Sequence, residues 1–198
     1  AYERLFRSDT IAIFFTDSLM PPLELKNFAD KHETPIFCSN LSSTEIITHL
    51  RYFLARELAD KVILHGVFME VSSLGVMLTG ESGLGKSELA LELVTRGHRL
   101  IADDAPEFMR IAPDIIMGSC PPILLNFLEV RGLGVLNIRK MYGDSAIKFS
   151  KYLRLIIHLT SMNSLSKSED RLSTPQLTKN VLGLEIPVIR VPVAAGRN

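Results

Sequence analysis

The sequence predicts an α/β protein in two parts: a small α/β unit over residues 1–58, and a domain over residues 59–198 with a mainly β core flanked by helices. Strand and helix patterns alternate before residue 58, whereas β-rich segments dominate after Lys61. A glycine-rich run at residues 80–87 follows an apolar strand and opens a helix. With 198 residues, 46% of them hydrophobic, the chain is long enough to bury such a core.

The first part reads as strand, helix, strand, helix. The expected segments are a strand at residues 11–15, an amphipathic helix from the Pro21-Pro22 pair to near His32, a strand at residues 34–38 and a helix to about Leu58. A capping signal at Ser43, followed by Glu45, marks the start of the last helix. Nothing in this unit indicates catalytic chemistry.

The second part contains several segments with strand character, at residues 62–71, 75–79, 100–102, 135–138 and 153–159. Between them, apolar residues recur on one helical face after residue 87 until Gly97 ends the helix. Residues 161–175 are rich in Ser, Lys and acidic side chains with little periodicity. That segment is expected to be a mobile surface loop.

The glycine-rich run matches the phosphate-binding pattern G-x-x-x-x-G-K-[ST] and consists of Gly80, Glu81, Ser82, Gly83, Leu84, Gly85, Lys86 and Ser87. Its glycines let backbone N–H groups gather around phosphate oxygens, and the following helix adds the positive end of its dipole. Lys86 is expected to reach the outer phosphates and Ser87 to ligate Mg²⁺. A chance glycine-rich turn is the alternative, but the flanking strand and helix favour nucleoside triphosphate binding.

Acidic residues follow this loop at two places. Asp103 and Asp104 end a strand, where carboxylates can hold a metal ion or orient a nucleophile; a turn or helix cap is the alternative, which the nearby phosphate loop disfavours. Glu129 lies beside paired glycines. It could be a second metal ligand or part of a local ion pair on a surface loop, and the sequence favours neither. His65 alone reads more readily as a core or edge residue than as a catalyst.

Charge and cysteine content give no support to several classes of partner and site. Lys+Arg and Asp+Glu number 22 each, so nothing indicates a nucleic acid or an anionic membrane as partner. No signal pattern or apolar run of membrane-spanning length is present, and the two cysteines lack zinc-site spacing, which favours a reduced, cytoplasmic protein. A basic stretch is either a docking patch or a solvated face, and it contains Arg139, Lys140, Lys148, Lys151 and Arg154.

These motifs, taken in order, resemble the HPr kinase/phosphorylase family. The likeness is carried by His65-Gly66, GESGLGKS at 80–87, GHRLIADD at 97–104, LEVRGLGVLNI at 128–138, Arg171 and the ending at residues 191–198. It covers residues 60–198, while residues 1–58 resemble the latter part of the family's N-terminal domain. The chain is therefore expected to hold a partial N-terminal domain and a P-loop kinase/phosphorylase domain that stops before the family's final helix.

The resemblance implies a cytoplasmic, hexameric, bifunctional enzyme that controls carbon metabolism through the sugar phosphotransferase system. It would phosphorylate a serine of the phosphocarrier protein HPr with ATP, and remove that phosphate with inorganic phosphate to give pyrophosphate. By motif match, Asp104 accepts the serine proton in the forward direction and returns it in reverse, with His65, Lys86 and Arg171 joining it in catalysis. Ser87 and Glu129 match the family's Mg²⁺ ligands, and residues 192–197 match a segment tied mainly to dephosphorylation.

Two other functions stay open on sequence alone: a nucleotide-gated regulatory NTPase without protein kinase activity, and a small-molecule kinase. The pairing of Asp104 with Arg171 and the terminal GRN favours the protein kinase. The sequence departs from the family at Ala105-Pro106-Glu107, where the family continues as a strand. Pro106 is therefore expected to bend that strand.

Overall fold

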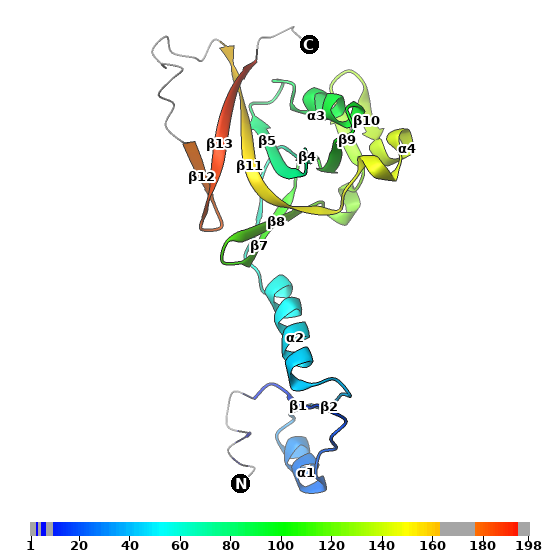
Figure 1. Cartoon of the computed structure of the whole chain (residues 1–198), viewed down its shortest axis with the longest axis vertical. Coiled ribbons are helices and arrows are strands. Elements are labelled where there is room, and N and C mark those ends of the chain that lie inside the picture. Colours follow the sequence, from blue (N-terminus) through cyan, green and yellow to red (C-terminus); the bar gives the residue numbers. More distant parts are fainter. Residues whose placement is uncertain (1–2, 4, 7–9, 163–176, 194–198) are drawn as a thin grey trace. The chain divides into compact units, whose positions relative to one another are not determined.

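The computed structural model describes residues 3, 5–6, 10–162 and 177–193, and it divides into two compact units, Ala1–Glu57 and Leu58–Asn198 (Figure 1). Helices and strands occur in both units, so the mixed α/β class expected from the sequence is confirmed. In the described part of the chain, no helix is both long enough and apolar enough to cross a lipid bilayer.

The smaller unit contains two parallel strands and two helices: β1 (Ile13–Phe15), α1 (Leu23–Lys31), β2 (Ile36–Cys38) and α2 (Ser43–Glu57). Leu25 and Ala29 of α1 are buried against Phe6 and form a small core. The order strand, helix, strand, helix is as the sequence predicts.

The residue that caps α2 is Ser42, so the assignment of the cap to Ser43 was wrong. The Ser42 hydroxyl accepts a hydrogen bond from the Glu45 N–H at 3.3 Å, and Glu45 Oε2 accepts one from the Ser42 N–H at 2.8 Å. This reciprocal pair is the capping box, whose partners are three positions apart with two residues between them. The Ser43 hydroxyl instead lies 2.9 Å from the hydroxyl of Thr16.

The larger unit is built on a nine-stranded mixed sheet. Seven strands follow the order β3-β7-β8-β11-β5-β4-β6, and β13 pairs with β11 and with β12. Their bounds are β3 Lys61–Ile63, β4 Val67–Val71, β5 Leu74–Gly80, β6 Arg99–Ala102, β7 Glu107–Ala112, β8 Ile115–Ser119, β11 Ser150–Ser161, β12 Leu177–Val181 and β13 Leu184–Val193. The strand expected over residues 62–71 is in fact two strands, β3 and β4, and His65 lies in the break.

Elements on both faces bury the middle of this sheet. One face is covered by α3 (Lys86–Thr95), the hairpin β9 (Phe127–Val130) and β10 (Gly134–Asn137), and α4 (Ile138–Tyr142), with Ala90 and Val94 of α3 in its core (Figure 1). On the other face, Phe68 packs edge-on against Phe108 of β7 at a centroid distance of 5.0 Å. Because β4 and β5 are buried on both faces, apolar residues follow one another along them, as at residues 67–69 and 76–78.

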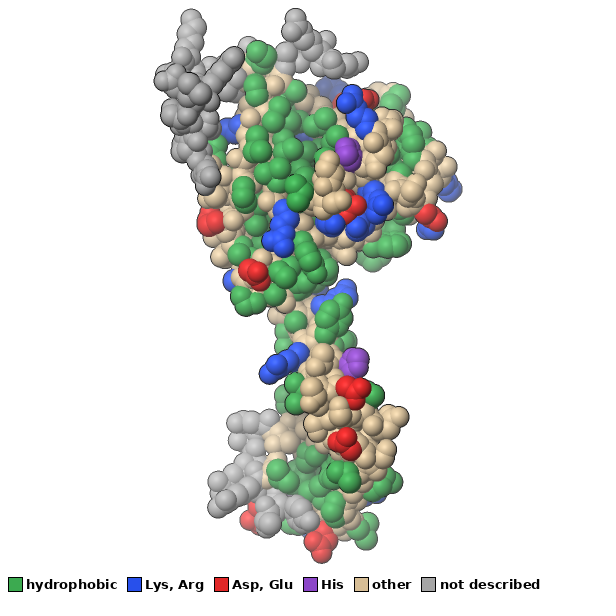
Figure 2. Space-filling model, in the orientation of Figure 1, with side chains coloured by type: hydrophobic (Ala, Val, Ile, Leu, Met, Phe, Trp, Pro, Cys, Tyr) green, Lys and Arg blue, Asp and Glu red, His purple; other side chains and the backbone are tan. Residues whose placement is uncertain are grey.

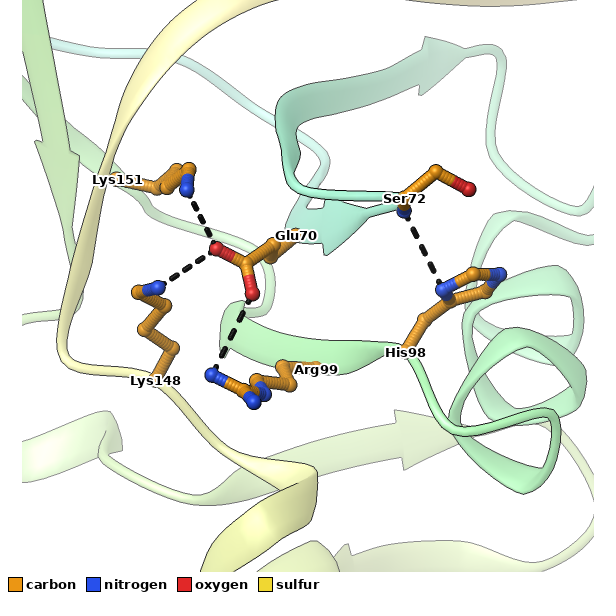
Figure 3. Close-up of polar contacts among 6 residues, drawn as sticks. All are labelled: Glu70, Ser72, His98, Arg99, Lys148 and Lys151. Atoms are coloured by element: carbon orange, nitrogen blue, oxygen red, sulfur yellow. Dashed lines mark hydrogen bonds and ion pairs between the residues drawn. The ribbon is translucent and has the colours of Figure 1, made fainter.

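Glu70 is the only charged residue buried in the part of the chain that the structure describes. Its carboxylate lies 2.6 Å from Lys148 Nζ, 2.7 Å from Lys151 Nζ and 3.5 Å from Arg99 Nη1 (Figure 3). Burial on its own raises the pKa of Glu70, but the hydrogen bonds and charges of the two lysines outweigh it and lower the pKa to about 2. The carboxylate thus ties β4 to β6 and to the start of β11.

We expect Glu70→Gln to lower the free energy of unfolding at pH 7 by about 1–3 kcal/mol, because it weakens charged hydrogen bonds to a buried group. A folded-state pKa depressed from 4.5 to about 2 means that the ionised form stabilises the fold above pH 4.5 and loses this effect as the pH falls toward 2. Urea unfolding between pH 7 and pH 2 should show the difference from wild type shrinking. Glu92→Gln, on an exposed helical ion pair, should show little effect at any pH.

Candidate active site

Three segments leave the sheet at one edge. β4 runs antiparallel to both of its neighbours, with Val67 opposite Leu78 of β5 and Phe68 opposite Ala102 of β6. The start of β4 therefore lies beside the ends of β5 and β6. The glycine-rich loop after β5, the His65-Gly66 pair before β4 and the Asp103-Asp104 pair after β6 consequently emerge together.

His65 and Asp104 are in direct contact at this edge. Asp104 Oδ1 lies 2.9 Å from His65 Nδ1, and both side chains are about 70% exposed, at 72% and 71%. Two backbone hydrogen bonds flank the contact: Gly66 donates to the Asp104 carbonyl at 3.3 Å, and Leu64 donates to the Pro106 carbonyl at 3.2 Å. His65 is therefore neither a buried core residue nor an isolated edge residue; it is held against a carboxylate that faces solvent.

Asp104 sits at the centre of a tight turn. Its φ is +63°, a region that aspartate tolerates better than most residues, and the Ala105 N–H donates to the Asp103 carbonyl at 2.8 Å. β6 has ended at Ala102 and β7 begins only at Glu107. The expectation that Pro106 bends the strand after the acidic pair was wrong, because the chain turns at Asp104 and Pro106 lies in the connection between β6 and β7.

The glycine-rich loop joins β5 directly to α3, which begins at Lys86, as the motif predicts. Lys86 Nζ lies within the loop and donates to the carbonyls of Gly80 and Glu81 at 2.9 and 3.0 Å. The N-terminal N–H groups of α3 and the lysine ammonium thus share one small region, which favours an anion. Ser87 follows in the first turn of the helix.

The β9–β10 hairpin contacts both the acidic turn and the loop. Glu129 donates its backbone N–H to Asp103 Oδ2 at 2.8 Å. An added Cβ at Gly83 would lie 3.6 Å from Arg131 Nη1, so the Arg131 guanidinium lies over the phosphate-binding loop. The hairpin contains most of the family-like segment at residues 128–138. Side chains of the hairpin therefore lie within reach of a ligand on the loop.

Asp103 is more protected than its neighbour. Burial raises the pKa of its carboxyl, and the nearby charges of Asp104 and Glu129 raise it further, against hydrogen bonds from the backbone of Glu129 and Asp104. Burial, with the charges of Asp103 and Glu107, also raises the pKa of the Cys120 thiol to about 11, which leaves it unreactive at neutral pH. The carboxylates of Asp103, Asp104 and Glu129 therefore concentrate negative charge beside the phosphate-binding loop. A bound cation would lower the repulsion among them.

Ser87 carries a hydroxyl and Glu129 a carboxylate, which are oxygen donors of the kind that Mg²⁺ binds. In the residues that the structure describes, no group of three or more His, Cys, Asp or Glu side chains is placed to hold a metal ion alone. Mg²⁺ usually takes only one or two carboxylates and completes its shell with phosphate oxygens and water. One hydroxyl and one carboxylate are the kind of donor set that this mode of binding uses.

Two residues have positions that the sequence did not predict. His158 of β11 lies 2.9 Å from the Thr79 hydroxyl, directly before the loop, and Arg131 also borders the site. A histidine inside an apolar strand gives no sequence signal for such a role. Other predictions fall outside the described residues. They concern Arg171, most of the loop expected at residues 161–175, and residues 194–198.

The basic stretch after residue 138 is largely paired within the protein. Arg139 Nε lies within 2.5 Å of Asp144 Oδ1, and Lys148 and Lys151 both bind Glu70. The stretch is therefore not a uniform docking patch of free bases. Two of its three lysines, Lys148 and Lys151, belong to a distinct ionic cluster at the opposite end of β4 from His65.

Gly66 is a position where a side chain does not fit. Its φ is +140°, and an added Cβ would lie 2.2 Å from the Leu78 carbonyl oxygen. We expect Gly66→Ala to cost about 1–3 kcal/mol of unfolding free energy and to move His65 away from Asp104. Gly97→Ala, at φ +89° with no atom within 4 Å of its Cβ, is the matched control. Equal unfolding curves for the two variants would contradict this account.

Known proteins are similar to this chain over almost its whole length. Residues 56–198 match the family described as the HPr Serine kinase C-terminal domain, and residues 1–54 match the HPr Serine kinase N terminus. The chain is 52% identical to the HPr kinase/phosphorylase of Stenotrophomonas maltophilia and 50% identical to that of Xanthomonas euvesicatoria, over 99% of its own length and 63% of theirs. It thus spans about three fifths of these curated relatives. The solved Hpr(Ser) kinase/phosphatase from Coxiella burnetii is 31% identical with a TM-score of 0.64, covering 69% of this chain and 82% of that one.

Proposed function

Because the chain belongs to the HPr kinase/phosphorylase family, we propose that it transfers a phosphoryl group from ATP to a serine of HPr, and removes it again by phosphorolysis. The observation that carries this proposal is the solvent-facing His65–Asp104 pair at the sheet edge where the phosphate-binding loop begins. A nucleotide switch needs the loop alone. A carboxylate exposed beside it provides a base for a hydroxyl that comes from another protein.

In the forward direction, the serine oxygen attacks the γ-phosphorus while the bond to the β-phosphate oxygen breaks. The serine proton passes to Asp104, and ADP leaves. Lys86 and the N-terminus of α3 neutralise the charge on the outer phosphates, which is most of what a loose phosphoryl-transfer transition state requires. His65, through its contact with Asp104, orients the carboxylate that accepts the proton.

In the reverse direction, inorganic phosphate attacks the phosphorus of phosphoserine, and the bond to the serine oxygen breaks. Protonated Asp104 gives its proton to that oxygen, and pyrophosphate leaves. One carboxylate can serve both directions by microscopic reversibility, because the acid that ends one reaction is the base that starts the other. Inorganic phosphate is expected to bind the same loop as the outer phosphates of ATP.

Mg²⁺ supplies charge neutralisation and alignment of the phosphates when it is bound. Ser87 and Glu129 are the residues proposed to hold it, and Asp103 fixes Glu129 through its backbone N–H. By motif match, Arg171 adds a further positive charge to the transferring group. The proposal also places the protein in the cytoplasm and, by family resemblance, in a hexamer.

The deciding experiment incubates the protein with γ-labelled ATP, Mg²⁺ and HPr. Label on an HPr serine, and pyrophosphate formed from phosphorylated HPr and excess phosphate, are the expected results. Hydrolysis of ATP with HPr left unlabelled would favour the nucleotide-gated regulatory NTPase instead. Label appearing on a small molecule in a mixture of metabolites would indicate a small-molecule kinase.

The terminal segment should separate the two directions. Since residues 192–197 match the segment tied mainly to dephosphorylation, Arg197→Ala is expected to lower phosphorolysis by more than about tenfold, or 1.4 kcal/mol, and to leave the kinase rate within about twofold. Pyrophosphate release and HPr labelling measured on one preparation give the ratio. Lys179→Ala, an exposed basic residue on β12, serves as the control. Equal losses in both directions would refute this division.

A further inference from the structure

A second group of cationic side chains meets away from the phosphate-binding loop. Arg99 at the start of β6, Lys148 before β11 and Lys151 within β11 converge on the one carboxylate of Glu70 (Figure 3). Both lysine ammonium groups contact the same oxygen, Oε2, so their nitrogens are no farther apart than the sum of those contacts, 2.6 and 2.7 Å. Arg99 contacts the other oxygen, Oε1.

This group, Arg99, Lys148, Lys151 and Glu70, carries three positive charges against one negative charge. Among the described residues, no other acidic side chain contacts its three bases. Each ammonium has three N–H donors and the guanidinium has five, so most of the donors are left over after Glu70 is bound. Two close ammonium groups repel one another, and a single carboxylate cannot compensate them and Arg99 together.

The bases are open to solvent while the carboxylate is not. The exposed fraction is 45% for Arg99, 32% for Lys148 and 26% for Lys151, but 10% for Glu70. Figure 2 shows Lys and Arg side chains gathered on the visible face of the larger unit. An incoming ligand would therefore meet the spare N–H donors, with Glu70 lying beneath them and holding them in place.

We propose that this group is a binding site for a phosphate group, either free phosphate or the phosphate of a small ester. A tetrahedral dianion offers several acceptor oxygens, which match two point-charge ammonium groups and a guanidinium fork. Its two negative charges equal the excess positive charge of the group. A monovalent anion such as chloride provides neither the charge nor the number of acceptors.

The site is distinct from the phosphate-binding loop. Glu70 and Arg99 face each other across β4 and β6, whereas His65 precedes β4 and Asp104 follows β6. The same two strands thus carry one site at each end. Phosphate bound at Glu70 is not expected to compete with a nucleotide on the loop.

The test is calorimetric titration of the protein with inorganic phosphate, in a buffer free of other multivalent anions. The loop is first saturated with Mg²⁺ and a non-hydrolysable ATP analogue, whose own binding is measured beforehand. Phosphate should still bind, at least about tenfold more tightly than to Lys151→Gln and Arg99→Gln, since each lost charge-assisted contact costs about that factor. Lys140→Gln removes the same charge from α4, outside the group, and should bind phosphate as the wild type does.

Glu70→Gln has the opposite expected sign. Removing the carboxylate leaves three uncompensated bases, so phosphate should bind more tightly to this variant, provided that its circular dichroism matches the wild type. A purely structural ion cluster would not give this reversal. A second titration with glycerol 3-phosphate distinguishes the sources: tighter binding indicates an ester, and equal or weaker binding indicates free phosphate.

Three results would overturn the proposal: no phosphate binding once the loop is filled, equal binding by Lys151→Gln and Lys140→Gln, or weaker binding by a folded Glu70→Gln. If Glu70→Gln does not fold, the lysine and arginine variants still decide. Failure of the nucleotide analogue to bind would count against the function of the loop. That outcome is separate, because phosphate titration of Lys86→Ala then isolates the site at Glu70.

Discussion

Lys86→Ala is expected to remove phosphoryl transfer in both directions, with rates falling by roughly 10²–10³-fold or more. Lys86 Nζ lies within the loop, donating to two loop carbonyls, and it is the only side chain of the loop motif that carries a positive charge. Without it, charge on the outer phosphates is met only by backbone donors and Mg²⁺. HPr labelling and pyrophosphate release, measured at saturating ATP and phosphate, report the loss.

The control for this variant is Lys140→Ala, which removes a lysine from α4 outside the loop and should keep full activity. Binding of ATP itself is expected to weaken less than the rate falls, because a charge that develops in the transition state gains more from the lysine than the ground state does. Wild-type rates in Lys86→Ala would show that the reaction does not use this loop.

Asp104→Asn is expected to lower both directions by about 10²–10⁴-fold, since an amide can neither accept the serine proton nor return it. The substitution keeps the size of the side chain and retains an oxygen that can stay near His65, which lies 2.9 Å from Oδ1 in the wild type. The fold should therefore be preserved, and nucleotide binding should change little. Parallel kinase and phosphorolysis assays with circular dichroism would check these three expectations.

Asp114→Asn provides the matched control, because it makes the same change at an exposed turn between β7 and β8. His65→Gln should fall between the two, with a loss in rate but not in nucleotide affinity, if His65 acts by orienting Asp104. An Asp104→Asn variant that loses only one direction would show that a different group handles the proton in the other.

The local part of the fold could be predicted from the sequence because its signals are local. The strand–loop–helix unit at residues 74–95 follows from glycine spacing and apolar periodicity, and both are set within about 20 residues. The capping box was misplaced by one residue, although its S-x-x-E spacing does identify Ser42. The break at His65 was missed because the segments before and after it both have strand character, although Gly66, directly after His65, is a turn signal.

Strands β7, β8, β9, β12 and β13 were not identified from the sequence in full. Each pairs with a neighbouring strand in a hairpin, but β7, β8 and β13 also pair with the distant strands β3 and β11. Strand character depends on which neighbours a segment packs against, so short runs without those neighbours are ambiguous. The turn at Asp104 is a similar case, since a positive φ there follows from the meeting of residues 64–66 with residues 104–106.

The candidate site was predictable as a set of motifs but not as an arrangement. The resemblance named His65 and Asp104, and the antiparallel register of β4 with β5 and β6 explains why they meet beside the loop. Arg131 lay inside a noted segment, yet only the hairpin geometry places it over Gly83. Glu70 gave no signal, because one acidic residue in a strand does not reveal three distant bases that converge on it.

The central claim is that the phosphate-binding loop and Asp104 form one site for a phosphoryl group and a serine hydroxyl. The most direct measurement is a crystal structure of the protein with Mg²⁺ and a non-hydrolysable ATP analogue. With the hydroxyl between them, about 3 Å from each, the γ-phosphorus and the nearer Asp104 oxygen should lie about 6 Å apart across open solvent. A γ-phosphate bound more than about 10 Å from that carboxylate, or separated from it by packed side chains, would contradict the account.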